Sequence, residues 1–298
     1  MTSQLSPLNS VERESLAHLE THVRSLASDA RGRNYHLGNT LIPSKNYITK
    51  QFQTAGYEVL FQEYLYDNIT YANIEVELLG TKYPDEIIVI GAHYDSVIYS
   101  PGANDNASGV AAVLEIARLL NRQSLSRTVR LVAFVNEEPP FFQTEAMGSL
   151  VYAKRSAARK ENIVAMFTPE TIGYFSDEPG SQTYPPLLDN FYPDKGNYIA
   201  LVSNLSSRQL LQAAVRIFRE QATLPAESVA LPIWVPGVAW SDQWSFWQYG
   251  YPGIMITDTA PYHYPYYHTP EDTPDKIDYD RMTRVVIGLY KMIERLSV

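Results

Sequence analysis

Four polar loops of this chain contain side chains that can bind a metal ion or transfer a proton. Each loop follows an apolar stretch, as GAHYDSVIYSPGANDNASG (91–109) follows DEIIVI and NEEPPFF follows LVAFV. The other two loops read PETIGYF and YHYPYYHTPEDTPDKID. The histidines and carboxylates of interest in these loops are His93, Asp95, Asp105, Glu137, Glu138, Glu170, His263 and His268.

The adjacent pair Glu137 and Glu138 is the most informative part of this pattern. Because the pair directly follows an apolar stretch, ordinary surface exposure does not explain it. Burying two carboxylates without a cation is costly, and one of them would be driven to take up a proton. A single histidine at the end of a strand is more often structural than a ligand. The joint pattern, however, predicts a divalent metal centre.

A pair of metal ions that shares one carboxylate would use these residues fully. Asp105 is the expected bridge, His93 with one further carboxylate would hold the first ion, and Glu138 with His268 would hold the second. The chain has no cysteine, and zinc accepts histidine and carboxylate ligands. Glu137 is then left without a metal, beside an activated water, as the general base.

Several segments resemble the zinc-dependent aminopeptidase family of cocatalytic metallopeptidases. They are GAHYDS, PGANDNASGVAAVLEIAR, VAFVNEE, ETIGY, SDQWSFWQYGYPG and YHTPEDTPDKI, in the family's order, and the resemblance runs from about residue 73 to the C-terminus. It implies that Asp95 orients the ring of His93. It also implies that Glu170 is the remaining ligand of the first metal, where the family has aspartate. The HTPEDTPDKI context favours His268 over His263 as the last ligand.

The family pattern also contains SDH where this chain has SDQ, at Asp242 and Gln243. These two residues are expected to help line the site, and neither is assigned as a ligand. The resemblance implies hydrolysis of N-terminal residues from peptides, with two zinc ions per chain or with one. The alternatives are a single-zinc glutaminyl cyclase, a carboxypeptidase or dipeptidase, and a scaffold without catalytic activity.

The elements that position these loops alternate between strands and helices along the chain. Helices are expected over 11–27, 44–55, 110–120, 147–160, 206–222 and 279–296. Strands are expected over 57–66, 72–80, 85–93, 128–135, 162–168 and 251–258. The alternation predicts an α/β fold, with a mostly parallel or mixed sheet, helices on both faces and the metal site at the C-terminal ends of the strands. We expect residues 1–298 to form one domain, with N-terminal helices in 1–60 packed on it. Residues 175–198 are expected to form a long loop over one face of this domain rather than a domain boundary.

The composition narrows the range of partners. A formal net charge of -9 argues against nucleic acid and against anionic membranes as partners. Peptide substrates are what the resemblance implies. No apolar run reaches the length of a spanning helix, and no signal peptide is visible at the N-terminus. The sequence as it stands therefore predicts a cytoplasmic protein, or a secreted one if a signal has been removed. The cluster IWVPGVAWSDQWSFW holds all 4 tryptophans and is expected to pack in the core or to line a substrate pocket.

Overall fold

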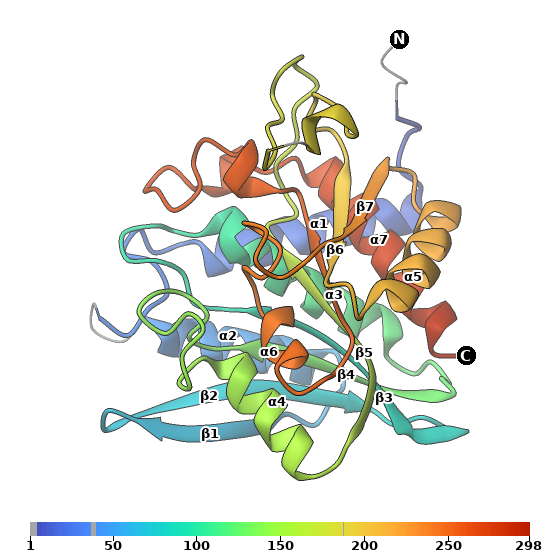
Figure 1. The fold of residues 1–298 in the computed structure, drawn as a ribbon. Helices are drawn as coiled ribbons and strands as arrows, with labels where there is room; N and C mark the ends of the chain where they lie inside the picture. The colour runs from blue at the N-terminus through green and yellow to red at the C-terminus, as the bar shows by residue number, and fades with distance from the viewer. Residues whose placement is uncertain (1–4, 37–39, 187) are drawn as a thin grey trace.

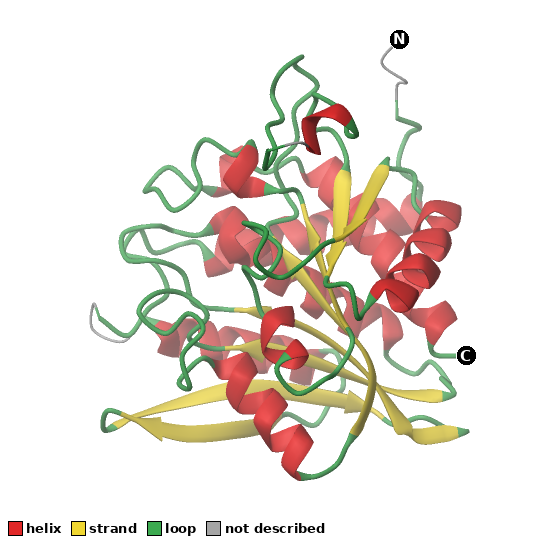
Figure 2. Cartoon of the chain, viewed as in Figure 1, coloured by secondary structure: helices red, strands yellow, loops and turns green. Residues whose placement is uncertain are grey.

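The computed structural model describes residues 5–36, 40–186 and 188–298. One 8-stranded sheet runs through the molecule and has helices on both faces (Figures 1 and 2). The strands are β1 (Leu60–Tyr66), β2 (Ile69–Leu78), β3 (Tyr83–His93), β4 (Arg127–Phe134), β5 (Asn162–Glu170), β6 (Ile199–Ser203), β7 (Ala226–Ala230) and β8 (Gly253–Thr257). The α-helices are α1 (Ser10–Leu26), α2 (Leu41–Thr54), α3 (Gly109–Leu120), α4 (Gly148–Ala158), α5 (Arg208–Gln221), α6 (Gln243–Trp247) and α7 (Tyr279–Leu296).

The order of the strands in the sheet brings the four polar loops together. The order is β1-β2-β4-β3-β5-β8-β6-β7, and the neighbours β4, β3, β5 and β8 run parallel to one another. In the register of these strands, His93 lies opposite Phe134, and Glu170 lies opposite Thr257. The carboxyl ends of parallel strands meet at one edge of a sheet. The loops after β3, β4, β5 and β8 therefore meet at that edge.

Each face of the sheet is buried beneath helices. One core contains apolar residues of α1, α2, α3, α5 and α7, and a second contains Tyr152 of α4 and Phe246 of α6. Figure 1 shows α4 and α6 in front of the sheet and the other helices behind it. Local signals in the sequence define the helix ends: Asn9 and Glu12 form a capping box at the start of α1, and Asp278 caps α7.

The predicted α/β fold, with a mixed sheet and helices on both faces, is confirmed. The sequence reading missed β6 and β7, which have 5 residues each, and the short helix α6. Helix α2 begins at Leu41, three residues before its predicted start at Ser44. Across the described ranges, no helix combines the length and the apolar character that crossing a membrane requires.

Candidate metal centre

The structure brings the predicted ligands from four loops into one buried cluster. His93 is the last residue of β3, Glu170 is the last residue of β5, and Glu138 lies in the loop after β4. Asp105 lies in η1 (Ala103–Ser108), a short irregular segment that leads into α3 and in which Asp105 has non-helical backbone angles, and His268 lies in the loop after β8. All but His268 are almost fully buried.

Among the described residues, three sets of side chains lie close enough together to hold a metal ion: one consists of His93, Glu137 and Glu138, and the other two share Asp105. The two groups that share Asp105 have the shorter separations. In the first group, His93 Nε2 lies 3.2 Å from Glu170 Oε2 and 3.4 Å from Asp105 Oδ1. In the second group, His268 Nε2 lies 3.0 Å from Asp105 Oδ2 and 3.4 Å from Glu138 Oε2. The two oxygens of Asp105 therefore face different groups, as a bridging carboxylate requires.

The donor set and its spacing fit metal ions. Bonds of 2.0–2.2 Å in a tetrahedral zinc site place neighbouring ligand atoms about 3.3–3.6 Å apart, close to the four distances of 3.0–3.4 Å in these groups. Three of the donor residues also contain a buried atom without a hydrogen-bond partner: His93 Nε2, Asp105 Oδ1 and Glu138 Oε1. Unpaired buried polar atoms are costly, and a cation would satisfy all three.

The charges of the cluster support the same conclusion. Burial alone would lower the pKa of His93, but the surrounding carboxylates, those of Glu170 and Glu137 first among them, together outweigh burial and raise that pKa well above its usual range. Burial, together with the charge of Asp105, raises the pKa of Glu138. The cluster therefore favours positive charge, which a proton on His93 or a metal ion beside it can supply.

Glu137 lies at the edge of the first group rather than within it. Its Oε2 is 3.9 Å from His93 Nε2, a longer separation than those between the donor atoms of the two groups. Burial raises the pKa of Glu137 well above its usual range; the charge of His93 opposes this rise, and those of Glu138 and Glu170 add to it. A buried carboxyl group with a raised pKa, beside a metal site, is suited to take up a proton and release it again.

Asp95 lies beneath the cluster and contacts both the histidine and the glutamate pair. Its backbone carbonyl lies 3.2 Å from His93 Nδ1, whereas its carboxylate is 3.6 Å from that atom. The carboxylate accepts hydrogen bonds from the backbone N–H groups of Glu137 (3.1 Å) and Glu138 (3.0 Å). Asp95 is thus placed to orient the ring, and it also holds the loop that carries both glutamates.

Glu170 reaches the first group although it replaces the aspartate of the family pattern. Its Oε2 accepts hydrogen bonds from Ser241 Oγ (2.6 Å) and from Asn106 Nδ2 (3.2 Å). The amide of Asn106 also bonds to the backbone on either side of Glu170, at Pro169 and Thr171. These contacts fix both the backbone and the carboxylate of Glu170, so the longer side chain still points at His93.

Asp272 connects the loop of His268 to the loop of Asp105. Its carboxylate accepts hydrogen bonds from the backbone N–H groups of Asn104 (2.8 Å) and Asp105 (3.0 Å). Burial raises the pKa of Asp272 to about 6. Asp272 therefore supports the backbone of Asp105, the proposed shared ligand.

Three other residues considered in the sequence analysis, His263, Asp242 and Gln243, lie outside the donor groups. His263 packs against Tyr174 and contacts Thr259 Oγ1 at 3.3 Å. Asp242 is fully buried, its oxygens have no hydrogen-bond partner, and burial raises its pKa to about 7. Gln243 donates to the carbonyl of Val238.

Arg33 is a residue of the site that the sequence reading missed. Its side chain is buried, and its guanidinium donates to the carbonyl oxygens of Tyr94 (2.8 Å) and Gly102 (2.9 Å). These carbonyls lie at the two ends of the loop that joins His93 to Asp105. A lone arginine in the N-terminal region has no distinctive sequence pattern, so only the fold reveals this contact.

Replacing Arg33 with methionine is expected to lower the free energy of unfolding by about 3 kcal/mol or more, because buried carbonyl groups lose a charged donor. Lysine should not restore the loss, since it lacks the planar fork that reaches both ends of the loop. Urea unfolding followed by circular dichroism measures the effect. Arg31→Met is the control, because Arg31 is exposed beside Asp29. Equal losses in the two methionine variants would contradict the assignment.

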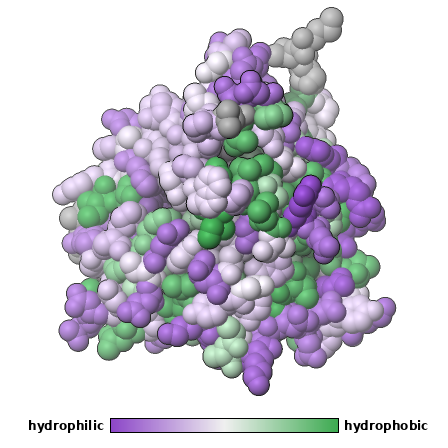
Figure 3. Space-filling view, viewed as in Figure 1, coloured by the Kyte–Doolittle hydropathy of each residue, from purple (hydrophilic) through white to green (hydrophobic). Residues whose placement is uncertain are grey.

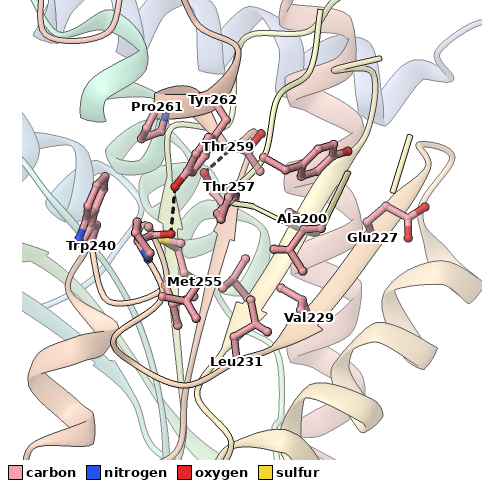
Figure 4. Close-up of a pocket in the computed structure, with 18 of the residues that line it drawn as sticks. Ala200, Glu227, Val229, Leu231, Trp240, Met255, Thr257, Thr259, Pro261 and Tyr262 are labelled. Atoms are coloured by element: carbon pink, nitrogen blue, oxygen red, sulfur yellow. Dashed lines mark hydrogen bonds between the residues drawn. The ribbon is translucent and has the colours of Figure 1, made fainter. Parts of the chain in front are cut away.

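An apolar pocket that is partly open to solvent adjoins the cluster. Glu170 and Tyr267, the neighbour of His268, lie on its wall. Figure 4 shows Ala200, Val229 and Met255 on the strands, Leu231 directly after β7, and Trp240 and Tyr262 on the segments between strands. Figure 3 shows hydrophobic residues gathered over this part of the molecule. Trp240 is therefore the tryptophan of the aromatic cluster that lines the pocket, whereas Phe246 packs in the core.

Comparisons with known proteins identify the family. Residues 73–292 match the model of Peptidase family M28. The chain therefore belongs to this family, which confirms the prediction of a metallopeptidase.

Two relatives show how far the similarity extends. The chain is 38% identical to the Escherichia coli K12 protein YfbL, over 92% of this chain and 86% of YfbL. It is 29% identical to Aminopeptidase YwaD of Bacillus subtilis, over 72% of this chain but only 42% of that protein.

Solved structures share the fold. LapB from Legionella pneumophila superposes with a TM-score of 0.76 at 21% identity, covering 98% of this chain and 76% of that one. The glutaminyl cyclase of Fimbriiglobus ruber gives a TM-score of 0.66 at 17% identity, covering 98% and 96%. At these identities the likeness concerns the fold alone.

Proposed function

We propose that this chain is a zinc-dependent aminopeptidase that removes N-terminal residues from peptides and binds two zinc ions. The observation that carries the proposal is the pair of donor groups that share Asp105. The aminopeptidase relative YwaD supports the same reaction class. His93 and Glu170 would hold the first ion, and Glu138 and His268 would hold the second.

The roles of the protein groups follow from their positions. Zinc, when bound, supplies Lewis acidity, which lowers the pKa of a coordinated water and polarises a carbonyl oxygen. Glu137 accepts the proton of the attacking water and delivers it to the amine that leaves. Asp95 accepts hydrogen bonds from the N–H groups of Glu137 and Glu138 and so holds the base and the ligand in fixed positions relative to each other. Burial of these groups strengthens each electrostatic contact.

A panel of aminoacyl p-nitroanilides and their N-blocked analogues tests the proposal. We expect hydrolysis of the free-amine substrates alone, lost with chelator and restored by zinc or cobalt. Hydrolysis of the N-blocked substrates as well would contradict an enzyme that requires a free N-terminal amine. Cyclisation of N-terminal glutamine without hydrolysis would favour a glutaminyl cyclase. A chain that binds no metal and has no activity would favour the scaffold.

The apolar pocket predicts a preference for bulky apolar N-terminal residues. Ala200 lies on its floor (Figure 4), so Ala200→Phe is expected to fill the space that such a side chain needs. The expected result is a fall in kcat/KM for leucine p-nitroanilide of about 10–200-fold, because methylene-sized changes in apolar pockets have effects of this size. Alanine p-nitroanilide is the control substrate. An equal fall for both substrates would contradict the role of the pocket.

A further inference from the structure

The strand β1 is an exposed edge of the sheet. It is first in the strand order and pairs only with β2, and Figure 1 shows it along the lower border of the sheet. Leu65 is 69% exposed and Phe61 is 44% exposed, and Leu60 and Tyr66 are exposed as well. The strand therefore presents both a free backbone edge and large apolar side chains to solvent.

Such an edge is unusual for a protein that remains a monomer. Free N–H and C=O groups along an edge strand can pair with another strand, and proteins normally block this with short strands, charges, prolines or bulges. β1 pairs with β2 over all 7 residues without a bulge, contains no proline and carries one charged side chain, Glu63. The opposite edge, β7, has only 5 residues, and Tyr192 donates a hydrogen bond to its Ser228 carbonyl. The β1 edge is thus the one suited to accept a partner strand.

The sequence of β1 indicates which strand fits. LFQEYLY has apolar residues at both ends, arranged symmetrically about Glu63. In an antiparallel pair centred on Glu63, Leu60 would lie opposite Tyr66 and Phe61 opposite Leu65, with all 7 residues paired. A two-fold interface requires a surface that complements itself in this way.

We propose that β1 pairs with β1 of a second copy of this chain, antiparallel and centred on Glu63, so that the two sheets become continuous. The proposal goes beyond the peptidase function and does not depend on it. The partner is a second copy rather than an unrelated strand because the apolar positions of β1 match those of its own reversed sequence.

The local contacts of β1 keep the edge in place for pairing. On one face, Gln62 donates to the carbonyl of Val151 (3.2 Å) and Tyr64 donates to that of Ala146 (2.8 Å), so the strand is held against the loop before α4 and against α4 itself. On the other face, Lys45 lies 3.8 Å from Glu63. Each copy would therefore place its own Lys45 ammonium group near the two-fold axis of the dimer, which reduces the repulsion between the two Glu63 carboxylates.

Cysteine cross-linking tests the pairing and its register. The chain contains no cysteine, so a single introduced thiol can react only with its counterpart in another copy. Directly opposed residues of antiparallel strands have Cα atoms about 4.5–5.5 Å apart, within the disulfide range. Under mild oxidation we expect Glu63→Cys to form covalent dimers. Leu79→Cys, at a site that is 65% exposed and away from β1, should not. No cross-linking at Glu63, or equal cross-linking at both sites, would overturn the proposal.

Sedimentation equilibrium tests the energetics of the same interface. We expect the unmodified chain to dimerise between micromolar and submillimolar concentration, and Leu65→Lys to raise the dimer dissociation constant at least about tenfold. Leu79→Lys is the matched control and should have no effect. Glu63→Thr should tighten the dimer, since like charges opposite each other are unfavourable. A monomer throughout this range, or a dimer that is insensitive to Leu65→Lys, would show that β1 does not pair with itself.

Discussion

Replacing Glu137 with glutamine is expected to lower kcat by about 10²–10⁴-fold and to leave the metal content unchanged. Glutamine keeps the size of the side chain but cannot accept the proton of a water. Glu137 lies 3.9 Å from His93 Nε2, outside the shorter separations of the donor groups, so its loss should not remove a ligand. The pKa of Glu137, raised by burial, suits a base that takes up a proton and then releases it.

The measurement combines kcat on an aminoacyl p-nitroanilide with metal content by mass spectrometry. Glu145→Gln is the matched control, because Glu145 is an exposed carboxylate in the same loop region. Loss of metal with activity retained would show that Glu137 is a ligand and not the base.

Replacing Asp105 with asparagine is expected to weaken metal binding at both positions by about 100-fold or more. Removing a residue that merely supports a ligand lowers metal affinity by about 10–100-fold, and Asp105 provides one oxygen to each donor group. His268→Ala, by contrast, removes a donor from the second group alone and should leave one metal ion bound.

Titration of the apo-protein with zinc or cobalt gives the number of ions and their affinities. Asp85→Asn is the control, because Asp85 is exposed on the same strand as His93. Equal stoichiometry in the Asp105 and His268 variants would contradict a shared carboxylate.

Periodicity predicted most elements of the fold because those elements are long or strongly apolar. α7 repeats apolar residues at helical spacing, and β3 is an apolar run buried on both faces. β6, β7 and α6 were missed because each has 5 residues, too few for a periodic pattern. Strands of this kind are stabilised by their neighbours in the sheet rather than by their own sequence.

By itself, the sequence indicated which side chains could act, because each proposed ligand or base lies at the end of an apolar strand or in the loop after it, within an ordered set of motifs. The tertiary structure alone decided how these side chains are held. Asp272 supports the backbone of Asp105 from 167 residues away, and Ser241 fixes Glu170 across 71 residues. Hydrogen bonds from Arg33 to Tyr94 and Gly102 link the loop between His93 and Asp105 to the N-terminal region. Such contacts have no local pattern, since the partners meet only after the sheet has formed. For the same reason, the sequence did not reveal that β1 is exposed. Its apolar residues predict a strand, but only the strand order shows that this strand lies at the edge of the sheet.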